Sequence, residues 1–425
     1  MNASEHAIAP APLVVVGIGA DGWAGLGEAA RAAVLAADGV VGSTRQLALL
    51  PEIDAAHRPW PSPMEPLVEE LVAGALAWNE HEGSGGTGAT GGVCVLASGD
   101  PMLHGIGATL ARRLPPDRLV VHPHPSAFAL ACARLGWPAA EVELVSAVAR
   151  PPEVLARLLQ PGRRLVVYAS GTSGAAEIVG VLRERGFGPS RFVVLEQLGG
   201  EAERISESTA DDWGAREADS LHAIAIDCVA EPGAPVFALV PGLPDDAYEN
   251  DGQLTKRQVR AITLAALAPT PGALLWDVGA GSGSVAVEWL RAESTARAVA
   301  IERHAERAER ARANARLLGV PQLEVVLGSA PEALCELPGP DAIFIGGGLT
   351  TGGVIQRCWY SLQPGGRIVA NAVTLEGERV LAFARERCGG TLVRIAISHA
   401  EPLGSFEAWR SQLPVVQWSA RKERA

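Results

Sequence analysis

The sequence lacks the segments that would place a protein in or across a membrane. No apolar run approaches the roughly 18 residues that a membrane-spanning helix requires. Met1–Pro12 has no cationic region followed by a long apolar one, as a secretory signal would have. The six cysteines are scattered and form no C-x-x-C pair, which favours structural thiols in a reduced compartment. We therefore expect a cytoplasmic protein that does not bind a membrane.

An excess of positive charge is also missing. The formal net charge is -12 at pH 7, which argues against general binding to nucleic acid or to anionic membrane surfaces. The nine histidines form no H-x-x-H or H-E-x-x-H pair, so no metal site is predicted. An anionic substrate would need local arginines that act against the overall charge of the chain.

The composition is that of a globular, loop-rich α/β chain with more than one domain. Among 425 residues, 48 glycines and 30 prolines occur without the G-X-Y period of a fibrous protein. This length exceeds that of a single core, so we expect two domains. The stretch Asp227–Asp251 is rich in proline, glycine and acidic residues, and we place the boundary there, between domains 1–234 and 235–425. Gly83–Gly92 is typical of a flexible surface insertion.

The second domain contains a strand, a glycine turn and a helix in direct succession. The apolar run Leu274–Val278 predicts a buried strand that carries Asp277 near its tip, and Ser284–Leu290 has helical spacing. Three glycines at alternate positions separate them: Gly279, Gly281 and Gly283. Such a turn forms a ligand crevice at the carboxyl edge of an α/β sheet. Its G-x-G-x-G spacing differs from the G-x-G-x-x-G of dinucleotide sites, which disfavours the alternative of a nicotinamide oxidoreductase.

A second acidic strand tip supports a nucleotide-like ligand at this crevice. Ala298–Glu302 is an apolar strand, and Glu302 follows the glycines at about the separation at which a carboxylate reaches ribose hydroxyls. Further strands are expected at Leu323–Leu327, Ala342–Ile345, Arg367–Ala370, Leu392–Ser398 and Val415–Trp418. This order fits a doubly wound sheet with an antiparallel last strand. A helix from Gln253 to Leu267 should be capped by Asp251 or Thr255.

The first domain opens with its own strand and glycine turn. The strand Leu13–Val16 precedes Gly17 and Gly19, and a later strand, Val93–Ala97, precedes Ser98-Gly-Asp-Pro101 and Gly105. Because Asp100 stands before a proline at a strand-to-helix junction, it either faces a ligand or caps the following helix.

These motifs resemble those of the tetrapyrrole methylases of corrin biosynthesis, over roughly residues 11–230. The residues that carry the resemblance are Gly17-Ile-Gly19, Ser98–Pro101 with Gly105, Pro125-Ser126, Arg134-Leu-Gly136 and Leu198–Ile205. The resemblance implies a two-lobed α/β domain that holds S-adenosyl-L-methionine (SAM) between its lobes. It also implies that the SAM pocket contains Gly17, Gly19, Asp100 and Gly105.

The second half resembles the class I methyltransferases, and more specifically the decarboxylating precorrin methyltransferase domain. The residues that carry this resemblance are Asp277–Gly283 with Glu302, Gln253–Lys256, Gly328–Ala333, Ile343–Gly347, Asn371–Val373 and Pro414–Trp418. It implies a Rossmann-like domain with a second SAM site made by Asp277, Gly279, Gly281, Gly283 and Glu302. Lys256 and Asn371, within the shared motifs, are the candidate catalytic residues. Further candidates for binding substrate carboxylates are Arg150 and Arg204.

As a whole, the chain is similar to the fused, decarboxylating precorrin methyltransferases of cobalamin biosynthesis. The resemblance implies a tetrapyrrole substrate, methylated at C5 by the first half and at C15 by the second, which also removes the carboxyl group of the ring-C acetate. It further implies a homo-oligomer. Two alternatives stay open at this point: another small-molecule substrate, or a first half that only binds substrate, since Ser146–Arg150 and Ser170-Gly171 differ from the usual pattern.

Overall fold

The computed structural model describes residues 12–74 and 92–424, and its contacts divide the chain into two compact units. Unit 1 comprises Met1–Ala149, Gly162–Val179 and Pro189–Cys228, and unit 2 comprises Arg150–Pro161, Gly180–Gly188 and Val229–Ala425. The predicted division into residues 1–234 and 235–425, with one methylation in each part, stays a prediction. The insertion expected at Gly83–Gly92 lies outside the described residues except for Gly92.

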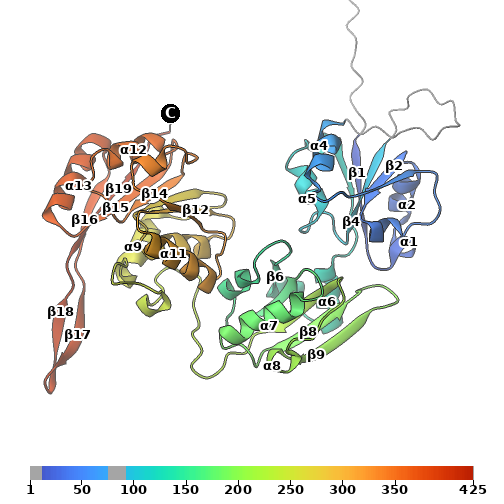
Figure 1. Cartoon of the computed structure of the whole chain (residues 1–425), viewed down its shortest axis with the longest axis horizontal. Coiled ribbons are helices and arrows are strands. Elements are labelled where there is room, and N and C mark those ends of the chain that lie inside the picture. The colour runs from blue at the N-terminus through green and yellow to red at the C-terminus, as the bar shows by residue number, and fades with distance from the viewer. Residues whose placement is uncertain (1–11, 75–91, 425) are drawn as a thin grey trace, which may run out of the picture. The chain divides into compact units, whose positions relative to one another are not determined.

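The first sheet of unit 1 is parallel and has five strands in the order β3-β2-β4-β1-β5 (Figure 1). Its central strands are buried continuous apolar runs, as parallel strands covered on both faces must be. The strands are β1 (Leu13–Ile18), β2 (Gly39–Gly42), β3 (Ala56–Pro59), β4 (Val93–Ser98) and β5 (Leu119–His122). The helices are α1 (Gly22–Gly25), α2 (Glu28–Leu35), α3 (Thr44–Leu47), α4 (Glu65–Ala73), α5 (Ile106–Ala111) and the 3-10 helix η1 (Pro116–Arg118).

The second sheet is mixed, with the order β6-β7-β10-β8-β9, and gives the first half its two predicted lobes. Its last two strands in the chain, β9 and β10, were not predicted. The strands are β6 (Val142–Ser146), β7 (Arg164–Tyr168), β8 (Arg191–Glu196), β9 (Arg204–Thr209) and β10 (His222–Asp227). The helices along this stretch of chain are α6 (Ala127–Leu135), η2 (Ala139–Glu141), η3 (Pro152–Arg157), α7 (Gly174–Glu184) and α8 (Ala210–Trp213).

Unit 2 contains a seven-stranded doubly wound sheet, ordered β13-β12-β11-β14-β15-β19-β16, in which β19 is antiparallel to both neighbours. The strands are β11 (Leu274–Val278), β12 (Arg297–Glu302), β13 (Glu324–Leu327), β14 (Ala342–Ile345), β15 (Arg367–Ala372), β16 (Thr391–Ile395) and β19 (Val415–Arg421). The helices are η4 (Asp245–Ala247), α9 (Arg257–Leu267), α10 (Ser284–Ala292), α11 (Ala305–Leu317), η5 (Glu332–Leu334), α12 (Val354–Ser361) and α13 (Leu375–Cys388). The expected Rossmann-like domain is confirmed.

Alternation along β11 decides which side chain faces which helix layer. Leu274, Trp276 and Val278 pack with α12 and α13, whereas Leu275 packs with α9, α10 and α11. Asp277 has the parity of Leu275, so its carboxylate points to the face that α10 covers.

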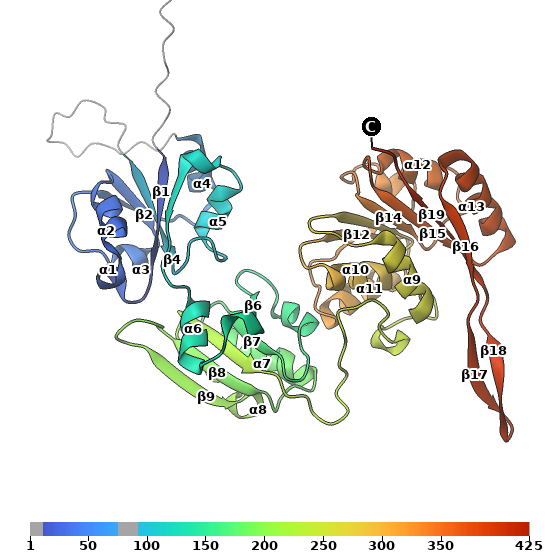
Figure 2. The same cartoon turned by 180° about the vertical axis from the view of Figure 1, so that it is seen from behind.

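A two-stranded ribbon, β17 (Ser398–Leu403) and β18 (Phe406–Ser411), projects from the sheet of unit 2 between β16 and β19 (Figures 1 and 2). This ribbon was not predicted; a strand was expected as far as Ser398, whereas β16 ends at Ile395. Two aromatic side chains of the ribbon, Phe406 and Trp409, are each 78% exposed.

One expectation about a helix cap is wrong, and one of the two alternatives for Asp100 is excluded. Helix α9 begins at Arg257 with Lys256 in the N-cap position, so neither Asp251 nor Thr255 caps it. Asp100 does not cap α5, whose N-cap is Gly105; its Oδ1 instead accepts a hydrogen bond from the amide of Met102 at 2.8 Å. Within residues 12–74 and 92–424, no helix has the length and apolar character to cross a membrane.

Candidate functional site

The glycine turn of unit 2 is held against the end of the neighbouring strand β14. Gly279 has a φ of +71°, and a Cβ there would lie 2.6 Å from the Cα of Gly347. The backbones of the two loops therefore touch, and any side chain at residue 279 would force them apart. Gly281 follows in the same turn, and Gly283 occupies the N-cap position of α10. The turn thus presents bare backbone at the carboxyl edge of the sheet.

Glu302, at the tip of β12, fixes the middle of this turn. Its Oε2 accepts a hydrogen bond from the amide of Gly281 at 2.9 Å, and its Oε1 accepts one from the amide of His304 at 2.9 Å. The side chain is only 4% exposed. Each carboxylate oxygen has a second lone pair, so Glu302 can still accept a hydrogen bond from a ligand hydroxyl.

Asp277 lies behind the turn and is buried. Its Oδ2 accepts a hydrogen bond from the amide of Ala286 in the first turn of α10 at 3.0 Å, and its Oδ1 has no partner among the described residues. Burial, assisted by the negative charge of Glu302, raises the pKa of Asp277 to about 7. The structure therefore ties Asp277 to the helix, with one oxygen left to accept a donor.

Asp277→Asn should change how the stability of the protein depends on pH. Because the folded pKa is above the unfolded one, Asp277 contributes stability that is full below about pH 4 and is lost as the pH rises towards 7. Between about pH 4 and 7, the free energy of unfolding of the asparagine variant, relative to that of the wild type, should therefore rise by about 1.4 kcal/mol per pH unit. Above about pH 7 the difference should stay constant. Urea unfolding at pH 5, 6, 7 and 8 measures the difference.

The control for this measurement is Asp251→Asn. The pKa of Asp251 is lowered, chiefly by a hydrogen bond from Arg307, so its effect on stability should not change between pH 5 and 8. A difference between Asp277→Asn and wild type that stays constant over this range would contradict the burial argument.

The two predicted catalytic residues lie near different parts of α9: Lys256 at its N-terminus and Asn371 beside its middle. Lys256 is half-exposed, with its Nζ 3.9 Å from Oδ2 of Asp245. Its segment borders the glycine turn, since a Cβ on Gly281 would lie 3.0 Å from the carbonyl oxygen of Gln253.

Asn371, in β15, lies beside the middle of α9. Its Nδ2 donates to Oγ1 of Thr263 at 3.1 Å, and its Oδ1 accepts from Nε2 of Gln417 at 3.0 Å. Gln417 also donates to Thr263 at 3.0 Å, so the three side chains form a closed network that fixes the orientation of the Asn371 amide. One amide hydrogen of Asn371 remains for another acceptor.

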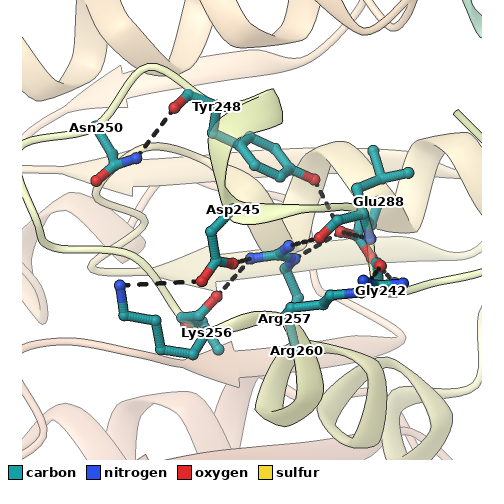
Figure 3. Close-up of polar contacts among 10 residues, drawn as sticks. Gly242, Asp245, Tyr248, Asn250, Lys256, Arg257, Arg260 and Glu288 are labelled. Atoms are coloured by element: carbon teal, nitrogen blue, oxygen red, sulfur yellow. Dashed lines mark hydrogen bonds and ion pairs between the residues drawn. The ribbon is translucent and has the colours of Figure 1, made fainter. Parts of the chain in front are cut away.

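A buried ion pair that was not predicted organises the chain around α9 (Figure 3). The Arg260 side chain is 0% exposed, and its Nε lies 2.6 Å from Oε1 of Glu288, which is 2% exposed. Glu288 also accepts hydrogen bonds from the amides of Gly242 and Leu243 and from the Tyr248 hydroxyl at 2.6, 3.0 and 2.9 Å. The Arg260–Glu288 pair therefore ties the segment before α9 to α10.

Arg260 also supports the segment that borders the glycine turn. Its Nη1 donates to the carbonyl oxygen of Thr255 at 2.5 Å and lies 3.2 Å from Oδ1 of Asp245, the partner of Lys256. The guanidinium stacks 4.7 Å from the ring centroid of Tyr248. The one signal in the sequence was a charge inside an apolar stripe, since Glu288 interrupts the apolar run Val285–Leu290.

Asn314 of α11 supports the glycine turn from the other side. It is fully buried, exchanges two hydrogen bonds of 2.9 Å with the backbone of Glu249, and donates to the carbonyl oxygen of Ser282 at 3.0 Å. Glu302, Gln253 and Asn314 therefore surround the turn with groups that fix its shape.

Unit 1 has a cavity of about 560 Å³ between its two sheets. Three of the predicted residues, Gly19, Asp100 and Gly105, line it. Gly17, within β1, does not line it, and a Cβ there would lie 2.2 Å from the carbonyl oxygen of Gly99, which follows β4. Tyr168 and His222 of the second sheet complete the wall, so both lobes contribute.

In the described part of the chain, the cavity wall contains one arginine, which was not among the predicted site residues. Arg45 of α3 lines the cavity, whereas Arg204 and Arg150 do not. Arg204 instead pairs with Glu196, its Nε lying 2.5 Å from Oε2. Since Arg45 belongs to none of the quoted motifs, only the topology, which places α3 beside the tip of β4, reveals it.

Comparison with known proteins finds relatives over the whole chain. A family model of tetrapyrrole (corrin/porphyrin) methylases matches residues 12–213, and a model of the precorrin methyltransferase domain matches residues 246–422. A Sinorhizobium protein named precorrin-6Y C(5,15)-methyltransferase [decarboxylating] is 44% identical over 421 residues, covering 99% of this chain and 98% of its own.

Two further relatives match only part of the chain. A protein of Pyrobaculum calidifontis, named probable cobalt-precorrin-6B C(15)-methyltransferase (decarboxylating), is 33% identical over 181 residues, covering 41% of this chain and 93% of its own. The crystal structure of a C-terminal domain of precorrin-6Y C5,15-methyltransferase from Rhodobacter capsulatus is 50% identical and covers 44% of this chain and 100% of its own, with a TM-score of 0.42.

Proposed function

The chain belongs to the family of decarboxylating precorrin-6Y C(5,15)-methyltransferases, and from that membership we propose that it methylates a precorrin at C5 and C15 and removes one carboxyl group. The methyl donor is S-adenosyl-L-methionine. The observation that carries this proposal is the 44% identity that extends over 99% of the chain, through both methyltransferase units.

The glycine turn of unit 2 fits SAM. Its backbone approaches that of Gly347 so closely that only glycine fits at residue 279. Glu302 is already aligned by the amides of Gly281 and His304 and would accept hydrogen bonds from ribose hydroxyls. When bound, SAM supplies a methyl group that its sulfonium charge activates.

The cavity of unit 1 would hold the other SAM molecule. Gly19 and Gly105 line it without side chains, and Asp100 is fixed by the amide of Met102 at 2.8 Å. We assign C5 methylation to unit 1, and C15 methylation with decarboxylation to unit 2. A division of the two methylations between the units is supported by the relative that covers only 41% of this chain and is named for the C15 reaction alone.

The residues of the chain mainly have to position the substrate. The enamine carbons of a reduced tetrapyrrole are nucleophilic, so alignment of the reacting atoms, worth roughly 7–11 kcal/mol, can supply most of the catalysis. Lys256 and the remaining amide hydrogen of Asn371 are the proposed donors to substrate carboxylates in unit 2. Asp245 and the Thr263–Gln417 pair hold them in place.

The function is tested by mass spectrometry of the product formed from a reduced precorrin and SAM. We expect a gain of two methyl groups and the loss of one carbon dioxide. Methyl groups labelled with ¹³C, followed by NMR, separate C5 from C15. A reaction that transfers no methyl group to the precorrin would exclude the proposed function.

We propose that the chain also forms a homo-oligomer through the β17–β18 ribbon. An isolated two-stranded ribbon is marginally stable in water, and this one exposes Leu403, Phe406 and Trp409 together with unpaired strand edges. A second copy could cover the same surface by symmetric pairing.

The double substitution Phe406→Ser/Trp409→Ser should shift the sedimenting species towards the single chain of 44.1 kDa. The physical reason is the loss of apolar surface that association would bury. Tyr360→Ser is the matched control, because Tyr360 is an aromatic residue 76% exposed on α12, outside the ribbon. Equal sedimentation of the ribbon variant and the wild type would exclude the ribbon as the interface.

A further inference from the structure

We propose that Arg45 forms a carboxylate-binding subsite in the cavity of unit 1. The inference rests on the proposed function, since a precorrin carries several carboxylates. It adds a residue and a ligand chemistry that the shared motifs do not assign.

The surroundings of Arg45 are built to hold it in the cavity wall. It lies in α3, where Ser43 and Gln46 form a capping box: the amide of Gln46 donates to Oγ of Ser43, and the amide of Ser43 donates to Oε1 of Gln46 at 2.7 Å. Gln46 Nε2 and Arg45 Nη2 both donate to Oγ of Ser98, at 3.0 and 2.9 Å. The helix is thereby fixed to the tip of β4, beside Asp100.

The guanidinium of Arg45 has no anionic partner in the described part of the chain. Its hydrogen bond goes to a neutral hydroxyl, and no carboxylate there forms an ion pair with it. Asp219 attracts it through space, but Oδ1 of Asp219 already accepts from Gln197 and from the amide of Leu221, at 2.9 and 2.8 Å. Burial lowers the pKa of Arg45, which means that its positive charge is only partly stabilised by its surroundings. A bound anion would stabilise this charge.

The cavity offers no competing cation of this kind. Among the described residues that line it, Arg45 is the single arginine or lysine, and Asp100 is the single carboxylate. The chain as a whole carries a net charge of -12, so an anionic substrate needs a local cation at the place where it binds. A guanidinium matches a carboxylate with two parallel hydrogen bonds, which fixes the orientation as well as the position of the bound group.

Two molecules could provide the carboxylate: the precorrin, or the methionine end of SAM. The precorrin is the better match, since SAM has an ammonium group beside its carboxylate and a sulfonium charge. We therefore expect Arg45 to hold a peripheral carboxylate of the precorrin and so to orient the ring for methylation at C5.

The test compares Arg45→Gln and Arg45→Lys with the wild type in the full chain. We measure the initial rates of C5 and C15 methylation while precorrin and SAM are varied in turn. Arg45→Gln should raise the KM for precorrin in C5 methylation by about 10- to 100-fold, the loss of a charged hydrogen-bonded pair. Arg45→Lys keeps the positive charge but cannot form two parallel hydrogen bonds to a carboxylate. Its KM for precorrin should therefore lie between those of the wild type and Arg45→Gln. C15 methylation and decarboxylation should not change.

The control is Arg113→Gln, which removes a surface arginine paired with Glu65 and Glu69, and it should leave all rates unchanged. A rise confined to the KM for SAM would identify SAM as the source of the carboxylate. If neither KM changes by more than 2-fold, the subsite is excluded. A wild type that methylates neither carbon would exclude the proposed function itself, which separates the two failures. If Arg45→Gln does not fold, Arg45→Lys decides by the same criterion.

Discussion

Gly279→Val should abolish the reactions of unit 2 while C5 methylation in unit 1 continues. A Cβ at this position would meet the backbone of Gly347 at 2.6–2.8 Å, and the φ of +71° is one that a β-branched residue cannot easily adopt. The turn must therefore leave the tip of β14, which moves its backbone from the place where SAM would bind. Because a displacement of about 1 Å can cost 100-fold in rate, C15 methylation and decarboxylation should fall at least that far.

Calorimetric titration with SAM measures the same effect as a change of stoichiometry. We expect two SAM molecules per wild-type chain and one per Gly279→Val chain. Gly352→Ala is the matched control, since a Cβ there would have no heavy atom within 4 Å. Two binding sites in the valine variant would contradict a SAM site at this turn, and none would contradict independent sites in the two units.

Glu288→Ala should destabilise the protein by about 3–5 kcal/mol, the usual cost of removing one partner from a buried ion pair. The change would leave the Nε of Arg260, the amides of Gly242 and Leu243, and the Tyr248 hydroxyl without their acceptor. Urea unfolding, followed by tryptophan fluorescence, measures the loss. Because unit 2 contains both partners, the transition that moves should be that of unit 2.

Two further variants test whether the stability loss in Glu288→Ala comes from the burial of the ion pair or from the loss of a charge alone. Glu309→Ala removes the partner of Arg312 in a surface pair on α11 whose glutamate is 75% exposed, and should cost less than about 1 kcal/mol. Replacing Arg260 and Glu288 together by leucine should lower the free energy of unfolding by less than the sum of the two single replacements, since neither charge of the pair is left buried without its partner. Equal costs for Glu288→Ala and Glu309→Ala would contradict the role given to burial.

The parts of the fold that follow from local pattern were predictable. The apolar runs that became β11, β12 and β14 are continuous because both faces of a doubly wound sheet are covered. The three glycines of the turn and Glu302 stand at strand tips, and the carboxyl ends of parallel strands meet at one edge. That the two strand tips meet, with Glu302 bonded to Gly281, is therefore a property that the sequence indicates.

Other features depend on contacts between distant segments. Arg260 and Glu288 are 28 residues apart in different helices, and only the packing of α9 on α10 brings them together. Arg45 and Ser98 are separated by 53 residues, and the cavity that they line forms when the two sheets of unit 1 meet. The β17–β18 ribbon has apolar residues in water, which contradicts the burial pattern from which strands are predicted.

The network around Arg260 also decides where the chain can be divided. The match to the precorrin methyltransferase domain begins at residue 246, yet Glu288 is bonded to the amides of Gly242 and Leu243. Arg291, which is 1% exposed, donates to the carbonyl oxygens of Phe237 and Ala238. A fragment that starts at residue 246 would expose Glu288 and Arg291 to solvent. Glu288 would lose two amide donors, and Arg291 would lose two carbonyl acceptors. The smallest piece of chain that keeps the second methyltransferase intact therefore starts before Phe237.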